Sequence, residues 1–494
     1  MSIFILACYF GILGMLCVFG WHRIHITYLF KKYARSVPLP NEKFDELPMV
    51  TVQLPVYNEK FVIERLIDAV AEIDYPRDRM YIQVLDDSTD ETRELAYQSV
   101  LQHRKQGLNI DYIHRTDRVG FKAGALEAGL QEAKGDFVAI FDADFIPNPH
   151  ILKESIHYFT DPDVGMVQTR WEHLNREHNT LTQVQAILLD AHFMIEHGGR
   201  CYSDRFFNFN GTAGIWRRQA IADAGGWQHD TLTEDLDLSY RAQMRGWRFL
   251  FLPDLTCPAE LPTDMVAFKS QQHRWAKGSI QVMKKLLPLI WRSHAPLKVK
   301  IEATFHLTGN LAYLLMIINS IFFVIPSMVV RQDLNWTRVL LIDGPLFLLA
   351  SVSFVHFYLS SQHAIFQSIK GRKRFIPALM ALGIGLGLNN ARAVVSALFG
   401  RESEFVRTPK TGMGATRRMG SPYFSRREAW AYAEIAIGAM YTGAIIWAIG
   451  TGTWASIPFL VLFQNGFLFV GCKTLWEHNQ QRRLTLQPIE KTAA

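Results

Sequence analysis

Cysteine is scarce in this sequence, and two short motifs are missing altogether. The 494 residues include five cysteines, with no CxxC pair and no metal-ligand spacing. This scatter gives no sign of a disulfide framework or a cysteine metal site, so we expect five reduced cysteines. No Walker-type GxxxxGK[ST] stretch is present. Its absence argues against a transporter with a nucleotide-binding insert.

Charge is absent from residues 2–20, which read SIFILACYFGILGMLCVFG, and further long apolar runs begin only after residue 304. The stretch between them has an ordinary globular composition. The pattern predicts a membrane protein with a large water-soluble insert. The first segment has no basic n-region and no small-x-small cleavage site. We therefore expect a signal anchor with the N-terminus outside.

The net charge of +6 does not indicate a nucleic-acid partner. The surplus lies mostly beside apolar segments, in HRIHITYLFKKYAR, KGRKR, RRMGSPYFSRR and QQRR. Basic residues flanking spans on the cytoplasmic side explain these clusters better.

Six segments approach the roughly 20 apolar residues that a span requires. They are 2–21, 307–330, 338–360, 375–399, 430–449 and 454–472. Basic residues flank 375–399 on both sides, and its second half is amphipathic, so we expect it to be interfacial or re-entrant. About five spans remain, which places the C-terminus inside.

The predicted organisation has seven parts. They are an N-terminal transmembrane helix (1–30), a cytoplasmic α/β domain (49–262), interfacial helices (263–303), a transmembrane hairpin (304–360), a basic segment with an interfacial helix and a loop (361–429), a second hairpin (430–472) and a cytoplasmic tail (473–494).

Within the insert, short apolar runs alternate with helical periodicity. MVTVQLP and YIQVLDD end in polar residues, and helical patterns follow at 59–73 and 91–105. FVAIFDAD and WRFLFLPD are later strands of the same kind. The alternation predicts a mostly parallel, doubly wound sheet, which binds ligands at the carboxyl ends of its strands.

Polar residues follow the predicted strands at that edge. They are Pro55, Tyr57, Asn58 and Glu59 after the first strand, Asp86 and Asp87 after the second, and Asp142 and Asp144 after the third. For Asp90, which follows the second strand, capping of the next helix is the better interpretation. It does not explain acidic residues at three strand ends. The Asp-x-Asp pair suits Mg²⁺ or Mn²⁺ bound to a diphosphate.

Two further motifs supply a cation and a candidate base. Lys122 in GFKAGAL begins a helix, where it suits a phosphate or a pyrimidine carbonyl; the alternative is a solvated surface lysine. Glu234 and Asp235 fall in the first turn of a helix capped by Thr233. Complementarity to the helix dipole explains them in part, and a general base is the functional interpretation of Asp235.

The stretch SQQHRWAKG, residues 270–278, lies in an amphipathic helical pattern. Gln271, Arg274 and Trp275 share one helix face. The indole suits stacking on a sugar ring, and the guanidinium suits a diphosphate. An interfacial tryptophan with a snorkelling arginine is the alternative, which leaves both glutamines without a role.

PVYNE, DDSTD, DAD, TED and QQHRW, in that order, resemble the processive family-2 inverting glycosyltransferases. The closest similarity is to the cellulose-synthase-like plant mannan and glucan synthases and their bacterial relatives. FNFNGTAGIWRR and EFVRTPKTG are also similar to that subgroup. The resemblance covers residues 48–412 and implies a GT-A domain inserted in an α-helical membrane protein.

The resemblance implies a role for each matching residue. Donor contacts would come from Pro55, Tyr57, Glu59, Asp87, Lys122, Asp142, Asp144 and Arg274. Asp142 and Asp144 would also bind the metal, and Asp235 would be the catalytic base. Acceptor contacts would come from Asn210, Gly211, Thr212, Glu234, Gln271 and Trp275. Phe405, Thr408 and Lys410 would belong to a gating loop, in which Arg407 stands where cellulose synthases usually carry valine.

The predicted function is processive polymerisation of a hexose from UDP-glucose or GDP-mannose, with export of the β-linked polysaccharide through the bundle. The alternative is transfer of one sugar to a membrane lipid. The sequence leaves the sugar, its linkage and any accessory protein open. Polar residues in the spans, expected to face a cavity or a partner, are Asn310, Tyr313, Asn319, His356 and Tyr358.

Overall fold

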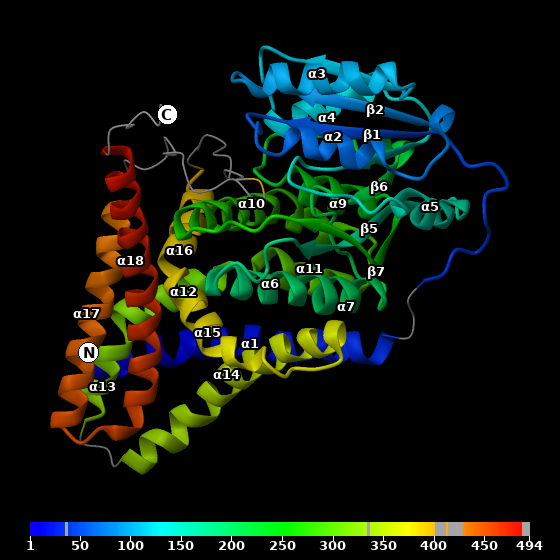
Figure 1. The fold of residues 1–494 in the computed structure, drawn as a ribbon. Helices are drawn as coiled ribbons and strands as arrows, with labels where there is room; N and C mark the ends of the chain where they lie inside the picture. Colours follow the sequence, from blue (N-terminus) through cyan, green and yellow to red (C-terminus); the bar gives the residue numbers. More distant parts are fainter. Residues whose placement is uncertain (35–37, 333–335, 401–411, 413–427, 487–494) are drawn as a thin grey trace.

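The structure, a computed structural model, describes residues 1–34, 38–332, 336–400, 412 and 428–486. An α/β domain occupies the upper right of Figure 1, and long helices lie beneath it and to its left. All five cysteines are free within these residues, as predicted.

A seven-stranded sheet with the order β3-β2-β1-β4-β6-β5-β7 forms the centre of the α/β domain. Its strands are β1 (Val50–Val56), β2 (Met80–Asp86), β3 (Ile110–His114), β4 (Phe137–Ile140), β5 (Val164–His173), β6 (Gly214–Arg217) and β7 (Arg248–Ala259). Only β6 runs antiparallel to its neighbours. The mostly parallel sheet is confirmed, although β3, β5 and β6 were not predicted.

Helices cover both faces of the sheet, and a separate apolar cluster lies under each set of helices. On one face, α2 (Ile63–Ala71), α3 (Thr92–Lys105) and α5 (Ile151–Ile156) pack against valines of β1. On the other face, α4 (Phe121–Gln131), α8 (Arg218–Asp223) and α9 (Glu234–Met244) pack against Val138 and Ile140 of β4. This double covering brings the carboxyl ends of β1, β2 and β4 to one edge.

The remaining long helices form a second group. They are α1 (Ser2–Tyr33), α11 (Leu297–Thr308), α12 (Leu311–Phe322), α13 (Val324–Val330), α14 (Trp336–Phe366), α15 (Ile376–Gly385), α16 (Gly387–Leu398), α17 (Glu428–Gly450) and α18 (Ile457–Leu486). Among the described residues, five helices are long and apolar enough to cross a membrane, or six if α11 and α12, bent by 53°, are one span. The expectation of about five spans therefore holds, whereas their orientation stays a prediction.

Segment 375–399 is the one that we expect to be interfacial or re-entrant, and its placement relative to the membrane stays a prediction. It forms α15 and α16, and the stretch Lys373–Leu398 is one of the five candidate spans. More than half of its apolar window is buried, and its two helices contact α10 (Met265–Arg292), α12 and α18. Its amphipathic second half turns polar residues toward protein. Asn389, for example, donates from Nδ2 to the backbone oxygen of Lys269 on α10, at 2.9 Å.

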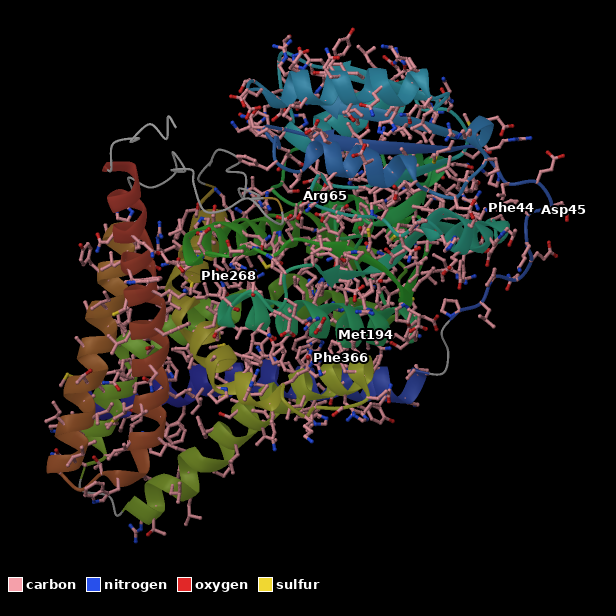
Figure 2. The ribbon with its side chains drawn as sticks, in the orientation of Figure 1. Phe44, Asp45, Arg65, Met194, Phe268 and Phe366 are labelled. Carbon is pink, nitrogen blue, oxygen red and sulfur yellow. The ribbon has the colours of Figure 1, made fainter. Side chains whose placement is uncertain are left out.

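The C-terminal half of α1 joins the helices to the α/β domain. In Figure 1, α1 runs beneath that domain. Ile26 and Phe30 press against two glycines of α7 (Gly198–Cys201), where an added Cβ would approach either side chain to 2.9 Å. Phe268 and Met194, both labelled in Figure 2, lie at the boundary between the two groups of elements. The α/β domain is thus packed directly against α1.

Substituting Gly385 with alanine should loosen the crossing of α15 and α18. The added Cβ would lie 2.3 Å from the backbone oxygen of Gly466 and 2.3 Å from Cγ2 of Val470. Overpacking of this kind costs about 1–3 kcal/mol. Thermal unfolding in detergent should show a lower Tm. Gly443→Ala is the matched control, because no atom of the described chain lies within 4 Å of its added Cβ. Equal Tm values for both variants would contradict the crossing.

Candidate active site

A cleft of about 200 Å³ opens at the carboxyl ends of β1, β2 and β4. Side chains from α9 and α10 complete its wall. The predicted residues that line it are Pro55, Tyr57, Glu59, Asp87, Lys122, Asp142, Asp144, Asn210, Gly211, Glu234, Asp235, Gln271, Arg274 and Trp275. Residues separated by more than 200 positions in the sequence therefore meet in one place.

Four residues with a predicted role are not among those that line the cleft in the described part of the chain. Thr212 is buried behind the cleft, where its Oγ1 accepts a hydrogen bond from the backbone N–H of Asp142 at 2.8 Å. Thr212 thus supports the Asp-x-Asp backbone and does not line the cleft. Phe405, Thr408 and Lys410 lie outside the described residues, so the gating loop stays a prediction.

Lys122 forms an ion pair with the first aspartate of the Asp-x-Asp pair. It begins α4 behind Gly120, whose positive φ of 74° suits glycine. Its Nζ donates to a carboxylate oxygen of Asp142 and, at 2.8 Å, to the backbone oxygen of Gly211. Burial alone would lower the pKa of Lys122, but the carboxylates of Asp142 and Glu234 raise it. The ammonium therefore stays charged in the cleft.

Asp235 lies in the first turn of α9, beside Glu234. Burial, followed by repulsion from Glu234, raises the pKa of Asp235 to about 7. An added Cβ on Gly211 would come within 3.1 Å of Asp235 Oδ2, so only a glycine leaves this carboxylate room. A half-buried carboxylate that titrates near neutrality is able to accept a proton from a substrate hydroxyl.

Helix α10 places its Gln271, Arg274 and Trp275 along one wall of the cleft, as the spacing predicts. Close contact with α9 fixes this arrangement. A Cβ on Gly278 would lie 2.5 Å from Cγ2 of Thr233, the residue that precedes Glu234. The small residue at position 278 therefore lets α10 reach the start of the helix that carries Asp235.

Several residues in the cleft were missed in the sequence. Arg118 lies over the ring of Tyr57, with 3.3 Å between its guanidinium carbon and the ring centroid. Trp171 and His173 come from β5, and Glu260 follows β7 and accepts from Arg65 at 2.7 Å. The strand-end argument applied to WRFLFLPD would have pointed to Asp254 and not to Glu260, because β7 continues beyond that stretch to Ala259. Trp171 and His173 could not be found by this argument, because β5 was not recognised as a strand.

Asp87 and its neighbour Asp86 have different surroundings. Asp87 receives two hydrogen bonds from Arg115, at 2.8 and 2.6 Å, so both of its carboxylate oxygens are occupied. Asp86 accepts from the Tyr112 hydroxyl at 2.6 Å and from the backbone N–H of Ser88 at 2.9 Å. It is fully buried and does not line the cleft.

A second cavity, of about 310 Å³, lies among the apolar helices. Two of the five polar span residues, Tyr313 and Asn319, line it. Arg23 also lines it, together with an ion pair in which Arg331 Nη1 lies 2.9 Å from Asp343 Oδ1. Asn310, His356 and Tyr358 do not line this cavity.

An Asp-x-Asp pair at a strand end of a mixed α/β sheet is typical of GT-A glycosyltransferases. Residues 48–278 match the family described as "Glycosyltransferase like family 2". The chain is similar to the Mannosyltransferase PcManGT from Pyrobaculum calidifontis, whose structure was solved with GDP-Man and Mn²⁺. The TM-score is 0.51 at 21% identity, and the match covers 81% of this chain and 99% of that chain. This likeness shows the fold.

Among curated relatives, Glucomannan 4-beta-mannosyltransferase 2 of Arabidopsis thaliana is 41% identical over 290 residues, which cover 58% of this chain and 54% of that protein. Glucomannan 4-beta-mannosyltransferase 7 of the same plant is 35% identical over 451 residues, which cover 86% of this chain and 77% of that protein. The chain thus spans about half the length of the first relative and three quarters of the second. It belongs to glycosyltransferase family 2, alongside these cellulose-synthase-like enzymes.

The pKa of Asp235 predicts the pH profile of transfer. Its carboxylate is the active form of a base, so kcat/KM should fall about tenfold per pH unit below the pKa of about 7 and level off above it. Glu234→Gln removes the repelling charge and should move the midpoint to lower pH. A rate that stays flat down to pH ~5, far below that pKa, would rule out Asp235 as the base.

Proposed function

We propose that this chain transfers mannosyl residues from GDP-mannose, repeatedly and with inversion, to the end of a growing β-linked polysaccharide. The observation that carries the proposal is the convergence of the Asp-x-Asp pair, Asp235 and the QQHRW face of α10 in one cleft. We choose GDP-mannose over UDP-glucose as the proposed donor because the relatives named above are mannosyltransferases.

The cleft supports a single displacement. Asp235 would take the proton of an acceptor hydroxyl while that oxygen attacks the anomeric carbon. The nucleoside diphosphate would then leave from the opposite face, which inverts the configuration. Lys122 and Arg274 are the cations placed to stabilise the leaving diphosphate. Tyr57, Glu59 and Asp87 stand at the ends of β1 and β2, where the nucleoside would lie.

A divalent metal fits this cleft. Asp142 and Asp144 are hard oxygen donors on its wall. The described residues hold no cluster of three or more metal-binding side chains. Two carboxylates nevertheless suffice for Mg²⁺ or Mn²⁺ when substrate phosphates complete the coordination. The bound ion would neutralise charge on the diphosphate, and Lys122 would share that task from its place beside Asp142.

The cavity among the apolar helices supports export of the product. Its wall combines tyrosine, asparagine and serine side chains with apolar ones. Polar groups inside a bundle are costly unless they meet a partner or a cavity. A neutral polysaccharide would meet both hydroxyl-binding groups and flat apolar surfaces along this wall. The proposal places the α/β domain in the cytoplasm and the product outside.

The direct test is product analysis with the purified full-length protein in detergent or nanodiscs. It should incorporate label from GDP-[¹⁴C]mannose into polymer that a β-mannanase digests. Asp235→Asn should abolish incorporation while donor binding stays within a few-fold, since loss of a base removes roughly 10²–10⁴ in rate. Incorporation of label from UDP-glucose and not from GDP-mannose would show that the proposed donor is wrong. Addition of a single sugar to extracted lipid would show that the enzyme is not processive.

Trp275→Ala should separate polymer growth from donor cleavage. An indole stacked on the acceptor sugar stabilises the elongating chain by about 1 kcal/mol or more, by analogy with aromatic pairs. Without it, polymer should shorten while hydrolysis of the donor to water persists. Arg274→Ala should slow both, because it acts on the leaving group. Parallel loss of both activities in the two folded variants would contradict this division of labour.

A further inference from the structure

A turn of π-helix lies directly behind the cleft, at His192–His197. It follows α6 (Thr180–Ala191), and such turns inside helices occur often at functional sites. The wider turn brings His192 and His197, five positions apart, onto one side, with 4.4 Å between their ring centroids. Regular α-helix would point them in different directions. Both imidazoles contact the side chain of Asn210, which lines the cleft.

The protonation of His192 follows from its two partners. Its Nδ1 lies 2.8 Å from a carboxylate oxygen of Glu196, which only accepts hydrogen bonds when ionised. Burial raises the pKa of Glu196, but Arg200 and His192 lower it by a larger amount. The net pKa lies below its usual value, so the carboxylate is ionised. Nδ1 of His192 therefore carries the proton. In the neutral ring, Nε2 is then an acceptor, and it faces Asn210 Nδ2 at 2.9 Å.

The second histidine fixes the other end of the same amide. Nε2 of His197 faces Asn210 Oδ1, so this nitrogen carries the proton and donates. Burial, followed by the proximity of His192, lowers the pKa of His197 well below its usual value. Its Nδ1 is buried with no hydrogen-bond partner among the described residues, as suits an unprotonated nitrogen. The amide of Asn210 is thus held in one of its two orientations.

The held amide has one N–H to spare. Asn210 Nδ2 carries two hydrogens, of which His192 takes one. The backbone N–H of Asn210 is already bonded to Gln168 Oε1, at 2.9 Å. The next residue, Gly211, lies beside Asp235 and Lys122. Because Asn210 lines the same cleft as Asp235, this unused N–H is the group that the amide can offer to a ligand there.

We propose that His192 and His197 are positioning residues, which hold Asn210 so that the acceptor sugar meets an N–H and not a carbonyl. The group recognised would be an oxygen acting as hydrogen-bond acceptor, such as a hydroxyl or ring oxygen of the terminal sugar. This assignment rests on the proposed transferase function. Neither histidine touches the substrate, and both act through Asn210.

Buried charges extend this arrangement to the apolar helices. Glu196 lies 3.5 Å from Nη1 of Arg200, whose Nε donates to Glu302 on α11 at 3.0 Å. Glu302 in turn lies 3.0 Å from Nε2 of His22 on α1. Met194, from the same π-turn, lies beside α1 and α14 in Figure 2. The carboxylate that fixes the tautomer of His192 is therefore connected, through Arg200 and Glu302, to the boundary with the apolar helices.

Paired substitutions test the assignment. His197→Leu and His192→Leu should each lower the ratio of sugar transferred to nucleotide released by about tenfold, the effect of one well-placed hydrogen bond. The KM for the donor should change less than about twofold. His197→Gln and His192→Gln place an amide near the lost Nε2 and should restore most of the ratio. Phe193→Leu is the packing control, since it removes an aromatic ring from the same turn and no bond to Asn210.

The tautomers themselves provide a test that needs no turnover. Side-chain ¹⁵N spectra of histidine-labelled protein, assigned by difference with the two glutamine variants, should show His192 protonated at Nδ1 and His197 at Nε2. Protonation of His192 at Nε2 would overturn the proposal, even if transfer proceeds as expected. An unchanged transfer ratio in folded leucine variants would overturn it too. Should the wild type transfer no sugar, the proposed function fails, and the spectra still decide on the held amide.

Discussion

Mutual repulsion among four carboxylates is the constraint on which the catalytic cleft depends. Burial lowers the pKa of Arg274, and the carboxylates of Glu234, Asp142, Asp235 and Asp144 each oppose that shift. Since Arg274 belongs to α10, a helix from outside the sheet supplies part of the charge that makes the cleft tolerable. Lys122 supplies another part from α4. The α/β domain and α10 therefore belong together electrostatically as well as by packing.

Burial is the larger cause of the raised pKa of Asp235, and repulsion from Glu234 adds to it. Lys122 acts in the opposite direction. A bound metal ion would favour the ionised form of Asp235, whereas a bound diphosphate would oppose it. The pKa of Asp235 therefore depends on which charged ligands occupy the cleft.

The sequence was informative where a function requires residues at strand ends. Asp87, Asp142 and Asp144 follow strands with long apolar runs, and the face of α10 follows from simple spacing. The π-turn at His192–His197 was not predictable, because its residues show no periodicity different from that of an α-helix. The strands β3, β5 and β6 were missed because they are short, partly exposed or antiparallel. Trp171 and His173 were missed together with β5.

Apolar runs alone do not define how the helices pack against one another. The segment 375–399 has basic flanks, and loop charge counts treat such a segment as lying at the membrane surface. In the structure it packs within the helix group, where α15 meets α18 through glycines on both helices. Such contacts depend on residues more than 80 positions away in the sequence. Local hydropathy contains no information about them.

The guanidinium of Arg118 over Tyr57 has a consequence for the end of each catalytic cycle. An aromatic face that already carries a cation is not vacant, and a nucleobase that stacks there must first displace it. The exchange subtracts the cation–π attraction, of about 0.5–2 kcal/mol, from the affinity for the nucleotide. The same attraction draws Arg118 back onto the ring when the nucleotide leaves. An enzyme with the proposed function releases one nucleoside diphosphate for every sugar added. In such an enzyme, an arginine that competes with the nucleobase favours rapid product release over tight product binding.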